Sequence, residues 1–277
     1  MGRSSDDSPL RRISAEACLL GGAGYAVLLQ IAHPSVAQGV YDHSDFASRP
    51  FDRLLGTLYF VYGTVYGTAE ERERLHAIVR ALHSKVNGPG YRALDDDLLL
   101  WVAATLVQTT SRMHAMMFGE LDKNEYARYL SEASVLATAL GLPQEKWPAT
   151  PEEFAAYWES NVEGLRVGEE ARDITGRLFR PASLPLRPLM RLQSLLTGGL
   201  LPPELREQLA IPWSEARQRR FDRVVGMTRA VYPWLPRPVR TLPTTLCLWS
   251  MRRGVLGPRW LAPPRRSSSR GRRNAVS

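Results

Sequence analysis

The sequence predicts an all-α protein, a single-domain multi-helix bundle, from three observations. Apolar residues recur at spacings of three and four through most of the 277 residues, which is the period of one helix face. Several segments open with helix-capping signatures, and none shows the apolar–polar alternation of a half-buried strand. The apolar fraction of 44% and the charged fraction of 23% are those of an ordinary globular protein.

The first helices are bounded by serine and proline. Ser14 is the expected N-cap of a helix that ends at the His33-Pro34 step, because a residue before proline disfavours helical geometry. A short helix is expected over 34–41. Pro50 then opens the next helix, through the sequence FDRLLGTLYFVYG.

The following helix carries the clearest local signal. TAEE at 68–71 is a capping box, with Thr68 at the N-cap and Glu71 three residues later. Asn87-Gly88 and the proline that follows predict its end. Its apolar residues recur at helical spacing and predict one buried stripe: Leu75, Val79, Leu82 and Val86.

Later helices follow from charge and caps. Three aspartates at 95–97 favour a helix N-terminus, and the apolar sequence LLLWVAATLV after them predicts a central helix. DKNE at 122–125 and TPEE at 150–153 are further capping signatures, and Ser214 is the expected cap of another helix. Frequent prolines after about residue 165 predict short helices joined by turns.

Charge and composition divide the chain into a flexible N-terminus (1–13), a helical domain (14–262) and a disordered Arg-rich tail (263–277). The tail carries five arginines and no acid, which leaves +3 of the net charge of +8 for the rest. We expect a solvated tail and no nucleic-acid partner, while peripheral contact with a membrane stays open. The oligomeric state does not follow from the sequence.

Cysteine usage and the apolar runs indicate the compartment. Cys18 and Cys247 lie in apolar surroundings, which is typical of thiols packed in a reducing compartment, so a cytoplasmic protein is expected. The apolar run at 17–32 contains Gln30 and is shorter than the about 20 residues that span a bilayer. The polar start MGRSSDDSPLRR is not of the kind expected of a signal peptide.

Common catalytic motifs are absent. The sequence has no H-E-x-x-H, G-x-S-x-G, Walker loop, dinucleotide fingerprint or C-x-x-C-H, which argues against zincins, serine hydrolases, nucleotide enzymes and covalent haem. A di-iron bundle needs a Glu-x-x-His motif on each of two helices. The one match, Glu73 to His76, has no second to support it.

Three polar features remain on apolar helix faces. His83 shares the stripe of the capped helix, as does His76 one heptad earlier, so it is either a satisfied core histidine or an axial metal ligand. Arg53 and Thr57, four residues apart, share a helix face; Arg53 either snorkels to the surface or pairs with a buried anion such as a propionate. The central helix carries a polar seam that lines a cavity or forms interhelical hydrogen bonds: Trp101, Thr105, Gln108 and Arg112.

These segments resemble a known family. LLQIAHPSVAQGVYDHSDFASRPFDRLLGT, HSKVNG and LDDDLLLWVAATLV are similar, in this order, to the haem-oxygenating domain shared by latex-clearing (rubber-cleaving) oxygenases and the fungal mycophenolate-pathway oxygenase. Many bacterial members long carried only a domain-of-unknown-function label. The likeness covers residues 15–165 and, more weakly, 200–214. It implies an all-α fold that encloses non-covalent haem b in a buried pocket.

The resemblance implies roles for single residues. The family's proximal iron ligand lies in an H-x-x-V motif, which is His83 to Val86 here, so His83 is the expected metal ligand. Arg53 and Thr57 match a pocket-lining pair expected in haem binding and catalysis. Further expected site residues are His33 and Thr105 as cofactor contacts, and Asp45, with Asp42 as the alternative, as catalytic base.

Two departures concern the activity. Rubber-cleaving relatives carry a lysine before the threonine that can occupy the sixth iron position, and this chain has Gly56 there. Many small relatives read WVHATL, and this chain has Ala103 in place of the histidine. The first departure puts rubber cleavage in doubt, and the second leaves open the loss of a hydrogen bond or proton path.

The expected function is therefore a haem b-dependent oxidoreductase of the oxygenase type. It would use dioxygen on a small apolar organic substrate, unsaturated ones included, with an electron donor as a further partner. The alternatives are a non-enzymatic haem-binding carrier or sensor, and a helical scaffold whose basic tail binds anionic partners.

Overall fold

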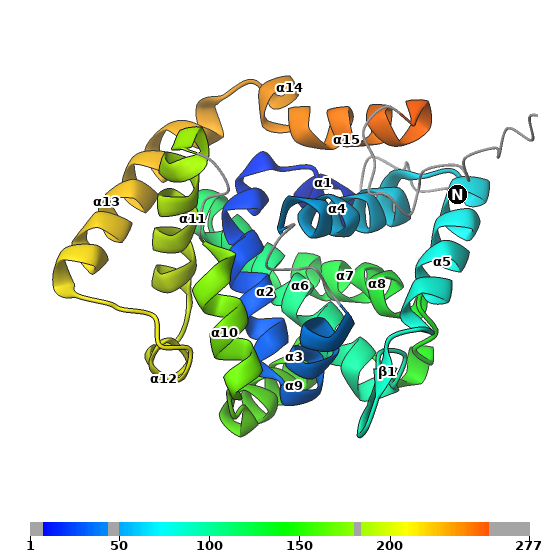
Figure 1. Ribbon diagram of the computed structural model, residues 1–277. Helices are drawn as coiled ribbons and strands as arrows, with labels where there is room; N and C mark the ends of the chain where they lie inside the picture. Colours follow the sequence, from blue (N-terminus) through cyan, green and yellow to red (C-terminus); the bar gives the residue numbers. More distant parts are fainter. Residues whose placement is uncertain (1–7, 44–49, 180–183, 255–277) are drawn as a thin grey trace, which may run out of the picture.

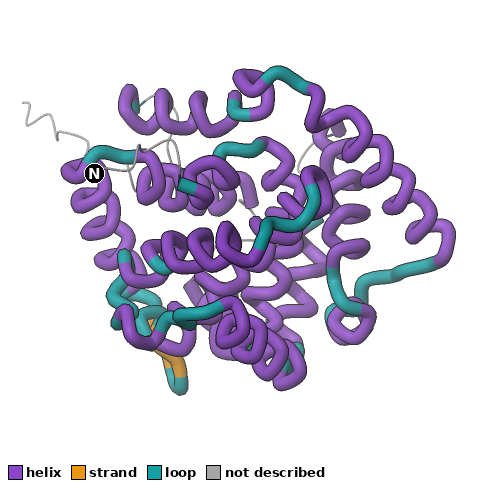
Figure 2. The backbone as a smooth tube through the Cα atoms, turned by 180° about the vertical axis from the view of Figure 1, so that it is seen from behind, coloured by secondary structure: helices purple, strands orange, loops and turns teal. Residues whose placement is uncertain are grey.

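A computed structural model describes residues 8–43, 50–179 and 184–254 (Figure 1). The all-α prediction is confirmed: among these residues only the two-residue strands β1 (Asn87–Gly88) and β2 (Tyr91–Arg92) pair, antiparallel (Figure 2). The α-helices are α1 (Pro9–Ser14), α2 (Ala23–Ala32), α3 (Pro34–His43), α4 (Pro50–Tyr66), α5 (Ala69–His83), α6 (Asp96–Phe118), α7 (Lys123–Ala133), α8 (Val135–Thr138), α9 (Pro151–Gly164), α10 (Glu169–Leu178), α11 (Arg187–Leu200), α12 (Pro203–Gln208), α13 (Glu215–Val231), α14 (Arg237–Arg240) and α15 (Leu242–Arg253). The 3-10 helices are η2 (Ala17–Gly22), η3 (Gln144–Lys146), η4 (Leu184–Leu186) and η5 (Tyr232–Trp234).

Helix α6 is central, as its sequence predicts. Trp101 and Met113 belong to a hydrophobic cluster with residues of α2, α3, α10 and α11. Leu99 and Val107 belong to a second cluster with residues of α1, α4, α5, α7 and α9. Because burial of apolar area is the main stabilising term, a helix shared by both clusters holds the two together.

The N-terminal region differs from its prediction. Residues 9–13, expected to be flexible, form α1, in which Leu10 and Ile13 are buried. Ser8, not Ser14, is the N-cap, and its hydroxyl accepts the Arg11 backbone N–H at 3.1 Å. The expected helix from Ser14 onward is divided into η2 and α2, and it ends at the His33-Pro34 step as predicted.

Helices α4 and α5 diverge from a short turn, so the start of α4 and the end of α5 are the ends remote from it (Figure 1). The predicted start at Pro50 and the capping box are confirmed. Thr68 Oγ1 accepts the Glu71 N–H at 3.2 Å, and the Glu71 carboxylate accepts the Thr68 N–H at 2.9 Å. Near the turn, a hydrogen bond of 3.0 Å between Thr64 Oγ1 and His76 Nε2 joins the two helices.

The other predicted caps are confirmed. The C-terminal third contains short helices such as α12 and α14, but also α11 of 14 residues and α13 of 17 residues, which are longer than the short helices that the prolines predict. Asp122, Thr150 and Ser214 each accept the backbone N–H three residues later. In the described ranges no single helix meets the length and hydropathy of a membrane span. Residues 17–43 would meet them only as a pair of segments bent by 105°. The expected tail over 263–277 lies outside the described residues.

Candidate functional site

His83 is the last residue of α5, and its ring nitrogen Nδ1 lies 2.9 Å from the Val79 carbonyl oxygen. A carbonyl oxygen only accepts hydrogen bonds, so Nδ1 must carry the proton. The lone pair of the neutral ring is then on Nε2. This is the arrangement of metal-binding histidines, which donate their other ring N–H to a carbonyl or carboxylate.

The surroundings of His83 combine an apolar helix face with partial exposure. On the predicted stripe Leu75 and Val79 are buried, while Leu82, Val86 and His83 itself are half-buried. A half-buried imidazole at the end of an apolar stripe is placed where the core meets the surface. His76, the competing histidine, is instead bonded to α4 through Thr64.

The turn after His83 is anchored to α3. His43 Nε2 donates to the Asn87 carbonyl oxygen at 3.0 Å, and the Tyr91 hydroxyl donates to Asp42 at 2.7 Å. Tyr91 is buried and packs so closely on Gly39 that a Cβ there would lie 3.2 Å from its ring. The DHSDF segment thus begins beside the turn that follows His83.

Two of the residues that the resemblance implies for the haem pocket lie at the start of α4. Arg53 and Thr57 are one turn apart on this helix, and Thr57 is exposed. The side chain of Arg53 and the whole of Asp45 lie outside the described residues. The roles of these three residues therefore stay predictions.

The polar seam of α6 forms interhelical hydrogen bonds with α2. Trp101 Nε1 donates to the Gln30 carbonyl oxygen at 3.3 Å, and Gln30 Nε2 donates to Thr105 Oγ1 at 3.1 Å. The Thr105 hydroxyl itself donates to Val102 in its own helix at 2.7 Å. At the other end Arg112 lies over the Tyr25 ring, 5.4 Å from its centroid. Thr105 is thus part of the α2–α6 contact, and its role as a cofactor contact stays a prediction.

His33 lies between α2 and α3, with its ring 6.5 Å from that of Trp101. Its Nδ1 is buried and has no hydrogen-bond partner among the described residues. Burial lowers the pKa of His33 below its ordinary value, although Asp97 opposes the shift. The ring is therefore neutral at pH 7 and keeps a buried polar atom available to a bound molecule.

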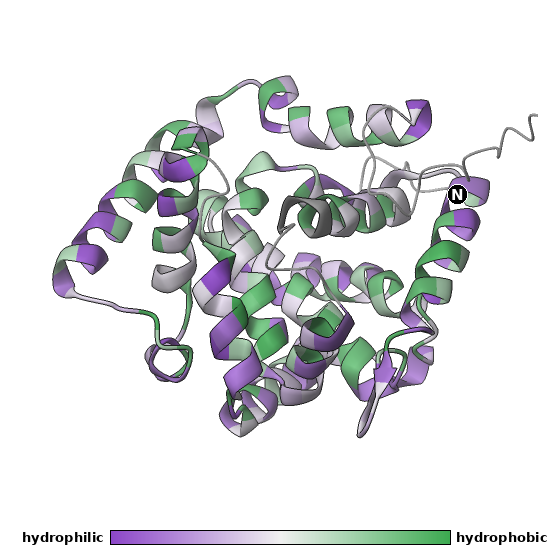
Figure 3. Ribbon diagram, viewed as in Figure 1, coloured by the Kyte–Doolittle hydropathy of each residue, from purple (hydrophilic) through white to green (hydrophobic). Residues whose placement is uncertain are grey.

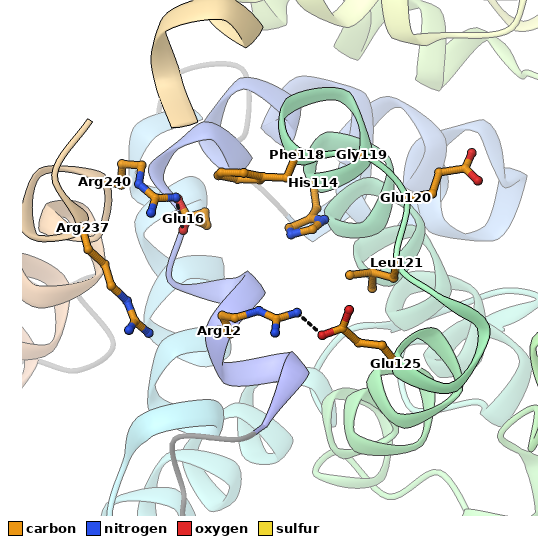
Figure 4. Close-up of a pocket in the computed structure, with 10 residues that line it drawn as sticks. All are labelled: Arg12, Glu16, His114, Phe118, Gly119, Glu120, Leu121, Glu125, Arg237 and Arg240. Atoms are coloured by element: carbon orange, nitrogen blue, oxygen red, sulfur yellow. Dashed lines mark hydrogen bonds and ion pairs between the residues drawn. The ribbon is translucent and has the colours of Figure 1, made fainter. Parts of the chain in front are cut away.

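A separate cavity of about 440 Å³ lies where α1, the end of α6 and α14 meet (Figure 4). Four of its charged residues form two ion pairs. Arg240 donates to Glu16 at 2.8 Å, and Arg12 pairs with Glu125. The Tyr232 hydroxyl also donates to Glu16 at 2.8 Å. The contacts of Arg240 and Tyr232 hold the C-terminal helices to Glu16, in the segment between α1 and η2. The sequence did not predict this cluster. A signal was Glu16, the lone acid between Asp7 and Asp42.

Both cysteines are free thiols, in line with the sequence analysis. Burial raises the pKa of Cys247 to about 11 and that of Cys18 to about 12. The reactive form of a cysteine is the thiolate, so neither residue is a candidate nucleophile.

A known protein family matches most of this chain. Residues 10–230 match the family described as ER-bound oxygenase mpaB/B'/Rubber oxygenase, catalytic domain. The chain belongs to this family. The match includes α4, α5 and α6, and it confirms the resemblance that the sequence motifs indicate.

Two mycobacterial proteins are similar over most of their length. The uncharacterized proteins Rv2237 of Mycobacterium tuberculosis and Mb2261 of Mycobacterium bovis are each 30% identical to this chain over 240 residues. These residues make up 82% of this chain and 93% of each relative. No solved structure matches this chain.

Proposed function

We propose that this oxygenase-family protein is a haem b-dependent oxidoreductase that uses dioxygen on a small apolar substrate, unsaturated substrates included. The observation that carries the proposal is the hydrogen bond from His83 Nδ1 to the Val79 carbonyl oxygen. It orients the ring and places the proton on Nδ1, so that Nε2 carries the lone pair that an iron ligand requires.

The donor set fits haem better than it fits a metal ion held by protein alone. No group of three His, Cys, Asp or Glu side chains suitable for a metal ion occurs among the described residues. Haem iron, whose four equatorial ligands come from the porphyrin, needs one imidazole. The buried Val79 and half-buried Leu82 beside His83 are apolar, as the contact face of a porphyrin requires.

The remaining roles follow from side-chain chemistry. Bound haem would supply a reducible iron at which dioxygen can be activated. Arg53 would pair with an anionic group such as a propionate, and the Thr57 hydroxyl would donate a hydrogen bond in the pocket. Asp45 would accept a proton from the substrate. Gly56, which has no side chain, cannot supply the lysine ligand that rubber-cleaving relatives carry there.

The optical spectrum of the purified full-length protein tests the proposal. Haem-loaded protein should show a Soret band, and His83→Ala should lose it while its far-UV circular dichroism stays that of the parent. Added imidazole should restore part of the band, because it replaces the missing ring. His76→Ala is the matched control: it removes a histidine of the same helix that is bonded to Thr64, and it should keep its haem.

Full haem content in His83→Ala would refute the assignment of the iron ligand. A carrier or sensor is distinguished from an enzyme by exposing the reduced protein to dioxygen with an apolar alkene. Reversible binding of dioxygen without product would favour the carrier or sensor over the oxygenase.

A further inference from the structure

The C-terminal helices expose a concentration of large apolar side chains. Among the described residues twelve large hydrophobic side chains are exposed, and eight of them lie in the short stretch 227–249. Scattered exposed hydrophobic residues are normal, whereas a concentration of them marks an interaction site. We name this set the C-terminal apolar surface: Met227, Val231, Trp234, Leu235, Val239, Leu242, Leu246 and Trp249.

Helix α15 exposes apolar side chains on one face and buries polar ones. Leu242, Leu246 and Trp249 follow at spacings of four and three, so they share one face, and each is about half exposed, at 49%, 53% and 50%. The polar residues Thr244 and Ser250 are buried instead. Thr244 donates to the Ala15 carbonyl oxygen at 3.1 Å, and Ser250 accepts the Tyr59 hydroxyl at 2.7 Å.

Helix α15 is held in place by polar contacts with α4 and α5. The Tyr59 bond fastens α15 to α4, and Arg252 pairs with Glu71 at the start of α5 at 2.9 Å. The helix therefore lies in a fixed position along one edge of the molecule (Figure 1), and hydrophobic residues recur along it (Figure 3). Trp234, in η5 just before α14, is 86% exposed and extends this surface.

The same part of the chain is strongly basic. Asp222 is the last acidic residue, and residues 223–277 contain twelve arginines, no lysine and no acid. The first 222 residues consequently carry a net charge of −4 within the chain total of +8. Arg229, Arg237 and Arg253 are exposed around the C-terminal apolar surface and form no ion pair within the described part of the chain.

We propose that the C-terminal apolar surface binds peripherally to an anionic lipid bilayer. Exposed tryptophan and leucine next to unpaired arginines is the composition that lies in a membrane interface, with apolar groups among the acyl chains and cations at the headgroups. A second copy of the chain is disfavoured, because a two-fold contact would bring two such basic surfaces together. Nucleic acid would attract the arginines but would not cover Leu242, Leu246 and Val239. The inference does not depend on haem.

Co-sedimentation of the full-length protein with vesicles tests this surface. Vesicles of phosphatidylcholine with phosphatidylglycerol should bind the protein, and vesicles of phosphatidylcholine alone should bind it far more weakly. Added salt should weaken binding, since it screens the arginines. The variant Leu242→Ser/Leu246→Ser/Trp249→Ser should lose binding by at least about tenfold, because it removes the apolar side chains that enter the bilayer.

A charge variant separates the two contributions. Arg229→Gln/Arg237→Gln/Arg253→Gln should weaken binding by about fivefold per charge removed. The matched controls alter exposed residues elsewhere and should bind as the parent does: Leu189→Ser/Leu192→Ser for the apolar variant and Arg74→Gln/Arg187→Gln/Arg191→Gln for the charge variant.

Three outcomes would overturn the proposal. The first is equal binding by the surface variants and their controls, or equal binding to neutral vesicles. The second is a dimer that the Leu/Trp variant dissociates. The third is salt-sensitive binding to nucleic acid without binding to vesicles. Circular dichroism of each variant checks that the fold is kept, and all the substituted side chains are exposed.

Discussion

Helices α5 and α6 both carry polar side chains on an otherwise apolar face, yet they use them differently. On α6 the polar groups of Trp101 and Thr105 are bonded to Gln30 of α2, in the interior of the molecule. On α5 the Nδ1 of His83 is bonded to its own helix, at a half-buried position.

The two kinds of hydrogen bond, one between helices and one within a helix, have different consequences for the polar group. A hydrogen bond across two packed helices fixes their register and satisfies buried atoms, so it stabilises the fold. A bond from one ring nitrogen to the preceding turn fixes the tautomer and prepares the other nitrogen for a ligand. Substitutions in α6 should therefore change stability, and substitution of His83 should change cofactor binding.

The largest expected effect on stability is that of Trp101→Ala. Trp101 is 1% exposed and stacks on Trp158 with ring centroids 5.6 Å apart. Its truncation leaves a cavity in the core and should reduce the free energy of unfolding by about 3–5 kcal/mol. Urea denaturation measures this. Trp249→Ala, at an exposed tryptophan, is the control and should change the free energy by less than about 0.5 kcal/mol. Similar losses of unfolding free energy in both variants would show that the buried tryptophan stabilises the fold no more than the exposed one does.

A smaller effect is expected from Thr105→Val, which keeps the shape of the side chain and removes its hydroxyl. Gln30 Nε2 then loses its acceptor inside the α2–α6 contact, which should cost about 1–3 kcal/mol. Thr245→Val is the matched control, because Thr245 is exposed and its hydroxyl donates to the carbonyl oxygen of Thr241, the N-cap of α15. If Thr105→Val lost haem but kept its stability, Thr105 would belong to the cofactor site.

Local signals made most of the fold predictable. The caps at Thr68, Asp122, Thr150 and Ser214 each depend on residues at most three positions away, and all four are confirmed. The division of the first long helix into η2 and α2 was not predicted, and glycines on both sides of it pack closely against segments far along the chain. A Cβ at Gly24 would lie 2.2 Å from Thr197 Oγ1 of α11, a close approach that no local pattern reveals.

For the candidate site, the sequence proposes residues but does not give their contacts. Helical spacing places His83 on the apolar stripe, but only the structure gives the Val79 bond that sets its tautomer. The sequence did not decide whether the polar seam of α6 lines a cavity or forms interhelical hydrogen bonds. The answer depended on α2, whose Gln30 lies far from Trp101 and Thr105 in the sequence.

The smallest expected effect is a dependence of stability on pH. Burial lowers the pKa of His33, His76 and His114 below the ordinary value of 6.5, and nearby arginines lower those of His76 and His114 further. The unfolded chain therefore binds more protons below about pH 6.5 than the folded chain does. Stability should be complete above this pH and should fall as the pH drops from about 6.5 toward the lowered values.

Urea midpoints at a series of pH values measure this dependence, and a histidine variant assigns it. In His33→Leu the fall in stability between about pH 6.5 and pH 5 should be shallower, because the ring beside Trp101 no longer resists protonation. If the dependence of stability on pH were unchanged in His33→Leu, the α2–α6 region would accommodate a charged imidazole at His33. The Nδ1 of His33, which has no hydrogen-bond partner among the described residues, would then have a partner in solution.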